Sequence, residues 1–572
     1  MRQEFVIRVR ILFAIVLGVA LLLVARLYML QVVHGEAYSA EASGQYVRSA
    51  RDIFDRGNIY FTQRTGERIA AASLKTGYLL AIHPDQIDNA EALYEALAPH
   101  VELDRDVFLA RATKEDDPYE EVARHLTPET AVAVEQLGET GVQLFREQWR
   151  YYPAGALGAH LLGFVGYGAE GDVQQGQYGL ERYWESVLTR QQEHLYVNFF
   201  AEVFANMRDA LENKERAKAA HLVTTVEPAV QQTLERVLME TEETWHAKQI
   251  GGIVMDPVTG EILALASRPT FDPNNYNMED SPTVYRNVLV EDVYEMGSII
   301  KPIAMAIGLD TEAVTADTLY NDTGSVTIDT ATIRNYDGRA RGMVDMQAVL
   351  NQSLNTGMAF VAEEVGSDVL GERMRAFGFG EETGIDLPFE VRGLIDNLDS
   401  PRDVEYATAA FGQGIALTPI ATVRALAALA NGGYLTTPHL VRTLEHESGE
   451  ERTVAPTDRV EVLQPETSRE ITRMLVEVVD STLRGGDVKK ERHSIAAKTG
   501  TAQIAKQGER GYYDDRFLHS FFGYFPAHEP RFLVFLFHVE PQGAQYASET
   551  LTDPFMDITD FLINYYHVPP DR

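Results

Sequence analysis

The chain has 572 residues, of which 50 are Lys or Arg and 85 are Asp or Glu, so its formal net charge at pH 7 is −35. A chain this acidic is repelled by phosphate backbones, which argues against nucleic acid as its main partner. The absence of Cys excludes thiol nucleophiles, disulfides and Cys-based zinc sites, and a hydrophobic content of 45% indicates a globular rather than a disordered chain.

The first predicted element is an apolar run at residues 11–33, in which Arg26 is the only charged residue. About 20 apolar residues span a bilayer, so we expect a single transmembrane anchor whose Arg26 snorkels to the interface. Three arginines precede the run, and the positive-inside rule then keeps residues 1–10 in the cytoplasm and places the rest outside. A cleaved signal peptide is the alternative, and it would also export the body of the chain.

Two regions follow the anchor. Residues 36–215 are mixed in character and rich in charge, and the polar, helix-like stretch at 208–220 is typical of a hinge. Residues 221–568 are more apolar and carry strand and helix signals together. We therefore expect two extracytoplasmic domains, with their boundary near residue 220.

The second region begins and ends with strand pairs. A hairpin is predicted at 251–267, around an Asp-Pro-Val-Thr-Gly turn, and a second antiparallel pair is predicted at 519–539. Between them, one helix is expected to begin after the Thr418 cap and to stop at Asn431. Strands at both ends with helices between them predict an α+β fold, in which an antiparallel sheet packs against helices.

The candidate chemistry begins at Ser298. Ser298 and Lys301 are three residues apart at the start of an apolar helix, so their side chains project from one face. Pro302 is compatible with the first turn of that helix, whose N-terminus favours developing negative charge. A lysine surrounded by apolar residues loses its proton more readily and can activate a serine. This Ser-x-x-Lys is the only one in the chain.

Two further segments complete a set. Ser353 and Asn355, in a helical stretch, offer a hydroxyl and an amide that can relay a proton and hold a substrate amide. The residues at 498–501, Lys-Thr-Gly-Thr, read as a strand whose glycine allows close approach of an extended peptide. Ser-x-x-Lys, Ser-Asp-Asn and Lys-Thr-Gly together are the signature of β-lactamases and penicillin-binding proteins, here with Leu354 in place of the Asp. A second Lys-Thr-Gly, at 75–77, is expected to be a strand that reaches a surface turn.

At this point the sequence resembles a class B penicillin-binding protein over nearly its whole length. Its N-terminal boxes resemble RGxIxDRNG, RxYPxG and GLE, and Thr62 and Gln63 depart from the first of these. The boxes lie at 56–66, 150–155 and 179–181, and similar downstream blocks lie at 254–274, 411–414 and 498–503. In the family the N-terminal boxes tie a pedestal module together and to the transpeptidase domain.

The resemblance implies an anchor, a pedestal (dimerisation) domain at 36–215, and at 221–568 a five-stranded antiparallel sheet flanked by helices, similar to serine β-lactamases. It also implies a D,D-transpeptidase that cross-links peptidoglycan stem peptides. Ser298 would attack the bond between the terminal D-alanines and form an acyl-enzyme, which an amine of a second stem would resolve. Lys301 would be the base, and Asn355 would orient the substrate amide.

The remaining roles follow from the same resemblance. Ser353 would relay a proton to the leaving amine, with Lys498 as a positive charge beside it. Thr499 and Thr501 would hold the terminal carboxylate next to Gly500, and the backbone N–H groups of Ser298 and Thr501 would form an oxyanion hole. No metal or organic cofactor is implied. β-Lactams would be inhibitors, and a polytopic lipid II polymerase would be the membrane partner, in septation or in elongation.

Three alternatives stay open. A serine β-lactamase shares the trio, but class A enzymes need a glutamate-activated water, and no Glu-x-x-x-Asn segment occurs between the second and third motifs. A bifunctional penicillin-binding protein would need a glycosyltransferase domain where the pedestal boxes lie. A non-catalytic scaffold of a cell-wall complex would not need all three motifs intact.

Overall fold

The computed structural model describes residues 55–115, 117–168, 174–190, 219–506, 508–509 and 511–572, together with Gly18. Apart from Gly18, the predicted cytoplasmic segment and anchor at 1–33 lie outside the described residues, as does most of the predicted hinge. In the part of the chain that is described, no helix combines the length and the hydrophobicity that a membrane span requires.

The chain divides into two compact units. The described residues of unit 1 are Gly18, Asp55 and those within Lys75–Trp149. Those of unit 2 lie within Arg56–Leu74, Arg150–Arg190 and residues 219–572. Strand β2 (Arg68–Ile82) runs from unit 2 into unit 1, and β4 (Val142–Tyr151) runs back.

Unit 1 is a small α+β layer. Strand β2 pairs antiparallel with β3 and is also paired with β4, and its buried side chains pack against two short helices. Each helix begins at a polar cap. In α3, for example, the side chain of Asn89 accepts hydrogen bonds from two backbone N–H groups of the first turn. The Lys-Thr-Gly at 75–77 lies inside β2, so the predicted strand is confirmed, whereas the predicted surface turn is wrong because the strand continues to Ile82. The other elements of unit 1 are α3 (Ala90–Leu97), α4 (Arg105–Ala112), β3 (Glu120–Leu126) and α5 (Pro128–Leu137).

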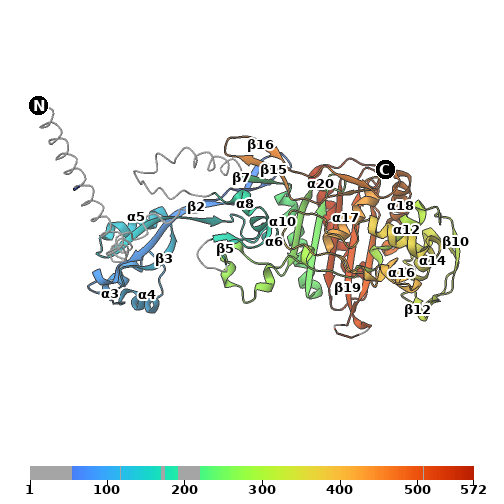
Figure 1. The fold of residues 1–572 in the computed structure, drawn as a ribbon, viewed down its shortest axis with the longest axis horizontal. Coiled ribbons are helices and arrows are strands. Elements are labelled where there is room, and N and C mark those ends of the chain that lie inside the picture. Colours follow the sequence, from blue (N-terminus) through green and yellow to red (C-terminus); the bar gives the residue numbers. More distant parts are fainter. Residues whose placement is uncertain are drawn as a thin grey trace, which may run out of the picture. The chain divides into compact units, whose positions relative to one another are not determined.

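The centre of unit 2 is a five-stranded antiparallel sheet (Figure 1). Its order is β18 (Ala496–Ala505), β19 (Tyr512–Phe525), β20 (Phe532–Val539), β8 (Gln249–Met255) and β9 (Ile262–Arg268). Figure 1 shows the green strands of the first hairpin beside the red C-terminal strands. Both predicted strand pairs, the α+β class and the five-stranded sheet are therefore confirmed.

Both faces of this sheet are buried, which explains why its strands are nearly continuous apolar runs. Along β20, Phe532, Val534 and Leu536 face one hydrophobic cluster, whereas Leu533, Phe535 and Phe537 face another. Helices α10 (Pro228–Trp245) and α20 (Thr552–Tyr566) cover the first face. The second face packs against the helical part of unit 2, which contains α12 (Lys301–Asp310), α14 (Asn355–Val365), α17 (Pro419–Ala430) and α18 (Pro465–Glu477).

Helix α17 illustrates how sequence signals set the helix ends. The Thr418 side chain accepts a hydrogen bond from Ala421 N, Pro419 occupies the first turn, and the helix stops before Asn431, as predicted. Gly433 then needs a glycine because its φ is +97° and a Cβ would lie 2.1 Å from Leu463 O.

A second sheet of unit 2 joins the N-terminal segment to the C-terminal part of the chain. Strand β1 (Ile59–Thr62) pairs antiparallel with the first residues of β2 and parallel with β7 (Ala220–Thr224), and β7 pairs with β15 (Val441–His446). The remaining strands of unit 2 are β5 (Val165–Tyr167), β6 (Gln174–Gly176), β10 (Leu319–Asp322), β11 (Ser325–Ile328), β12 (Ala331–Arg334), β13 (Gly342–Asp345), β14 (Tyr434–Thr436), β16 (Glu451–Thr453) and β17 (Arg459–Glu461). Its remaining α-helices are α6 (Ala159–Leu162), α7 (Gly179–Tyr183), α8 (Glu185–Leu188), α11 (Val288–Glu291), α13 (Met346–Asn351), α15 (Ser367–Ala376), α16 (Asp403–Ala409) and α19 (Ala547–Thr550).

Candidate active site

Ser298 lies in a 3-10 turn, η6 (Gly297–Ile299), that leads directly into α12, with Pro302 in the first turn of that helix. The predicted position at a helix N-terminus is therefore confirmed. The turn is tightly held: Gly297 has φ +64°, and a Cβ there would lie 3.1 Å from Thr501 O. Ser520 Oγ donates to Met296 O over 2.9 Å, which fixes the segment before the nucleophile against the central sheet.

Lys301 is completely buried, and its amine reaches the second motif. Nζ donates to Ser353 O at 2.6 Å, to Ser353 Oγ at 3.1 Å and to Asn355 Oδ1 at 2.8 Å. Burial lowers the pKa of the Lys301 amine well below its usual range, and the nearby Lys498 lowers it further. A neutral amine in this position can accept a proton from a neighbouring hydroxyl.

The second motif corrects one sequence-based expectation. Ser353 and Asn355 were expected within one helical stretch, but the stretch is two helices, α13 and α14, broken at Ser353. Ser353 has φ +54°, a left-handed conformation that is costly for a residue other than Gly. In this conformation the carbonyl of Ser353 accepts from Lys301 Nζ, while Asn355 opens the next helix.

Lys498 approaches the same hydroxyl from strand β18. Its Nζ donates to Ser353 Oγ at 3.2 Å and to Thr499 O at 3.1 Å, and burial lowers its pKa to about 8. Ser353 Oγ thus lies between two lysine amines. The Lys301 amine therefore loses its proton more readily than the Lys498 amine.

Among the described residues, strand β18 is an edge strand that pairs only with β19. Its outer edge can therefore receive an extended peptide by strand addition. Thr499 is half-buried, and Thr501 Oγ1 accepts from Ala547 N at 3.0 Å, which leaves its own O–H free to donate.

The close backbone approach expected at Gly500 is found in the structure. A Cβ there would lie 2.3 Å from Ser520 Oγ and 2.8 Å from Met296 O. The backbone that approaches Gly500 is that of the segment before the nucleophile, and the approach of a peptide substrate stays a prediction. Hydrogen bonds bring Lys301, Ser353, Asn355 and Lys498 together, next to Thr499 and Gly500. Ser298 lies three residues before Lys301, in the turn whose Gly297 packs against Thr501.

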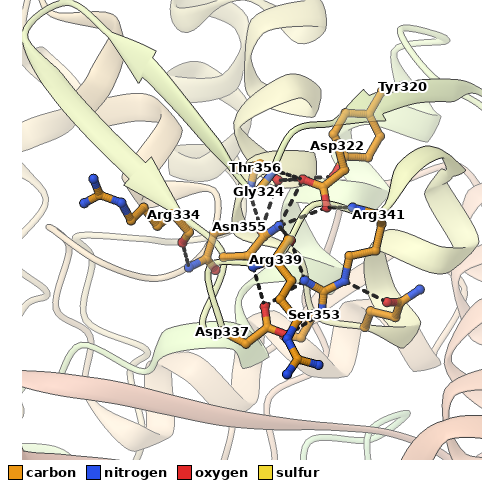
Figure 2. Close-up of polar contacts among 12 residues, drawn as sticks. Tyr320, Asp322, Gly324, Arg334, Asp337, Arg339, Arg341, Ser353, Asn355 and Thr356 are labelled. Atoms are coloured by element: carbon orange, nitrogen blue, oxygen red, sulfur yellow. Dashed lines mark hydrogen bonds and ion pairs between the residues drawn. The ribbon is translucent and has the colours of Figure 1, made fainter.

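Two contributors were missed at the sequence level. Ser520 lies opposite Gly500 on β19, so strand pairing alone would have placed it there once the register was known. Asp322 is buried behind Asn355 and binds the loop that supports it (Figure 2). No pattern in the sequence marks it, because its partners lie up to 34 residues away.

Comparison with known proteins gives a consistent result. The family model of the penicillin-binding protein transpeptidase domain matches residues 250–559, and that of the penicillin-binding protein dimerisation domain matches residues 54–224. Stage V sporulation protein D of Bacillus subtilis is 31% identical over 96% of this chain and 84% of its own length. Peptidoglycan D,D-transpeptidase FtsI of Escherichia coli is 27% identical over 98% of this chain and 92% of its own length.

Solved structures agree on the fold. Penicillin-binding protein 3 from Mycobacterium tuberculosis, in complex with aztreonam, superposes with a TM-score of 0.68 at 22% identity, covering 91% of this chain and 98% of that one. Penicillin-binding protein 2X from Streptococcus thermophilus superposes with a TM-score of 0.72 at 18% identity, covering 90% and 81%.

Proposed function

The chain belongs to the class B penicillin-binding proteins, and from this premise we propose that it is a peptidoglycan D,D-transpeptidase whose nucleophile is Ser298. Its substrates are stem peptides that end in D-Ala-D-Ala, and β-lactams acylate the same serine. The observation that carries the proposal is the buried Lys301 amine, one helical turn from Ser298 and in contact with Ser353 and Asn355.

In the first half-reaction Lys301 Nζ takes the proton from Ser298 Oγ as Oγ bonds to the carbonyl carbon between the two D-alanines. The C–N bond then breaks, and the leaving amine of D-alanine receives that proton through Ser353 Oγ. In the second half-reaction the amine of another stem attacks the ester carbonyl and loses its proton to Lys301, and Ser298 Oγ departs and is reprotonated.

Substrate binding uses the edge of β18. The Thr499 and Thr501 hydroxyls hold the terminal carboxylate, with Lys498 supplying positive charge, and Asn355 orients the substrate amide. The backbone N–H groups of Ser298 and Thr501 bind the developing oxyanion, an interaction whose loss typically costs about 10²–10³ in rate.

The remaining parts of the chain have supporting roles in this proposal. Residues 11–33 form the single anchor, with residues 1–10 in the cytoplasm, the pedestal at 36–215 and the transpeptidase domain at 221–568 outside. What supports this topology is the apolar run and the three arginines before it. Anchor and pedestal pair with a polytopic lipid II polymerase, in septation or elongation.

A fluorescent penicillin tests the proposal. Wild-type protein is expected to carry a covalent label that survives denaturation, and Ser298→Ala is expected to carry none. Ser448→Ala, at an exposed serine in the β15–β16 turn, is the matched control and should label fully. An unlabelled wild type would favour the scaffold alternative, and label that persists in Ser298→Ala would exclude Ser298 as the nucleophile. Rapid continuous hydrolysis of nitrocefin would instead support a β-lactamase.

A further inference from the structure

Asp322 ends strand β10, directly behind the second motif, and its side chain is fully buried. We infer that Asp322 is a positioning residue for the transpeptidase site, which holds Asn355 and Ser353 in place through the loop that follows β12. The inference rests on the proposed function, because that function gives Asn355 and Ser353 their roles.

The carboxylate of Asp322 is surrounded by donors. Oδ1 accepts from Gly324 N at 2.9 Å and from Thr356 Oγ1 at 2.8 Å, Oδ2 accepts from Arg341 N at 3.0 Å, and Asn335 Nδ2 lies 3.0 and 3.1 Å from the two oxygens. A carboxylate is acceptor-only, so it can satisfy all four groups at once. Figure 2 shows these contacts converging on Asp322 from three segments of chain.

One line of contacts leads from Asp322 to Asn355. Asn335 is bound to the carboxylate through its side chain, which fixes the preceding peptide group, and the Arg334 carbonyl of that group accepts from Asn355 Nδ2 at 3.0 Å. Because Asn355 Nδ2 is held there, its Oδ1 is turned toward Lys301 Nζ, 2.8 Å away. The amide orientation of Asn355 is thus set from the side opposite Lys301.

A second line leads to the helix that begins at Asn355. Thr356 donates its hydroxyl to Asp322, and its backbone N–H donates to Asn335 Oδ1 at 3.2 Å. The first turn of α14 is therefore tied to the same cluster.

A third line leads to Ser353. Arg341 N donates to Asp322, and Arg341 Nε donates to Gln352 Oε1 at 3.1 Å, one residue before Ser353. Ser353 keeps its costly positive φ only if both sides of the break are held. Asp322 contributes to each side, and since it is fully buried it does so without touching substrate.

The test is the second-order rate of acylation by a fluorescent penicillin in Asp322→Asn, with thermal unfolding measured on the same samples. The side-chain amide of Asn at position 322 directs its NH2 group toward groups that are themselves donors. The loop that carries the Arg334 carbonyl is then no longer held, and Asn355 loses its fixed orientation. We expect acylation to slow by about 10- to 100-fold, as small misplacements of reacting groups do. The effect should fall mainly on the acylation step and less on the initial noncovalent binding of the penicillin.

Asp386→Asn is the matched control. Asp386 is also a buried carboxyl that accepts from two backbone N–H groups, those of Leu440 and Val441, but these lie outside the three motifs. We expect it to lower the unfolding temperature while leaving acylation within about 2-fold of wild type. Equal acylation rates in the two variants would overturn the inference.

A double-mutant cycle separates positioning from general destabilisation. In an Asn355→Ala background, Asp322→Asn should slow acylation by clearly less than it does in the wild-type background, because one of the two groups it positions is gone. A full additional loss would overturn the inference. If Asp322→Asn fails to fold, Thr356→Val removes one donor of the same cluster and should show the same non-additivity with Asn355→Ala. Wild type that takes no label would overturn the proposed function and the inference together, whereas every other result concerns Asp322 alone.

Discussion

Ser353 Oγ accepts hydrogen bonds from two lysine amines, Lys301 at 3.1 Å and Lys498 at 3.2 Å. Burial lowers the pKa of both amines, because it disfavours their charged forms. Lys301 is lowered more, since the charge of Lys498 adds to its burial. The two amines are therefore suited to different roles, Lys301 to that of a base and Lys498 to that of a cation.

This division predicts a bell-shaped pH dependence of acylation. Lys301 must be neutral to accept the serine proton, so the rate rises as pH increases through its lowered pKa. Lys498 must be charged, so the rate falls as pH increases past about 8. Lys498→Arg keeps its charge across this range, and its profile, normalised to its own maximum, should lose the falling limb. The rate constant for penicillin labelling between pH 5 and 10 measures both limbs.

The control for this experiment is Lys489→Arg, at an exposed lysine paired with Asp480. It should reproduce the wild-type profile. A falling limb that is unchanged in Lys498→Arg would assign that limb to another group and contradict the role given to Lys498.

At the scale of elements, the three N-terminal boxes meet in one buried ion cluster within unit 2. Glu181 of α7 binds Arg56 Nε and Arg150 Nε, each at 2.5 Å, and Arg150 Nη1 donates to Gly57 O. All three charged side chains are almost completely buried. The cluster joins the start of β1, the end of β4 and α7, which agrees with the structural role expected for the boxes.

Glu181→Gln is expected to destabilise the protein by about 3–5 kcal/mol, because it removes the carboxylate that the buried Arg150 guanidinium contacts and one of the two that Arg56 contacts, the other being Glu185. Chemical denaturation followed by fluorescence measures the loss. Glu445→Gln is the control: its pair with Arg68 has both side chains 32% exposed, so we expect a change of no more than about 1 kcal/mol. Similar losses in the two variants would show that the buried cluster is not a main source of stability.

The same scale shows what the sequence could predict. The strand pairs β8–β9 and β19–β20, the cap of α17 and the helix start at Ser298 were predicted because each depends on residues adjacent in sequence. The break at Ser353 was not, since it depends on contacts with Lys301, 52 residues earlier. Asp322 was missed for the same reason. The sequence predicted a close backbone approach at Gly500, but not that Met296 makes it.

At the scale of the whole molecule, unit 2 is assembled from segments on both sides of unit 1 in the sequence. Phe164 stacks on Tyr276 with ring centroids 4.3 Å apart, and His160 Nε2 lies 2.9 Å from Val284 O. Tyr152 N donates to Asn274 Oδ1, and Asn274 Nδ2 donates back to Tyr152 O. The boundary expected at 221 follows the change from charge-rich to more apolar sequence. The hydrophobic core of unit 2, in contrast, contains residues from both sides of this boundary.

Two shortened chains distinguish these views. A chain of residues 221–572 lacks Leu161 and Leu162 and the β1 strand, all of which pack in the same core as Ile262 and Phe271. Each buried side chain of this size contributes about 1.5–3 kcal/mol, so we expect this chain to unfold at a lower temperature and to bind a hydrophobic dye, compared with residues 55–572. Both chains keep all three motifs, so penicillin labelling at low temperature reports whether each has folded its site. Equal unfolding temperatures and equal dye binding would mean that the transpeptidase domain is complete from 221 onward. The N-terminal segments would then contact the domain without stabilising it. A destabilised shorter chain that still labels at low temperature would instead show that these segments stabilise the domain without forming its site.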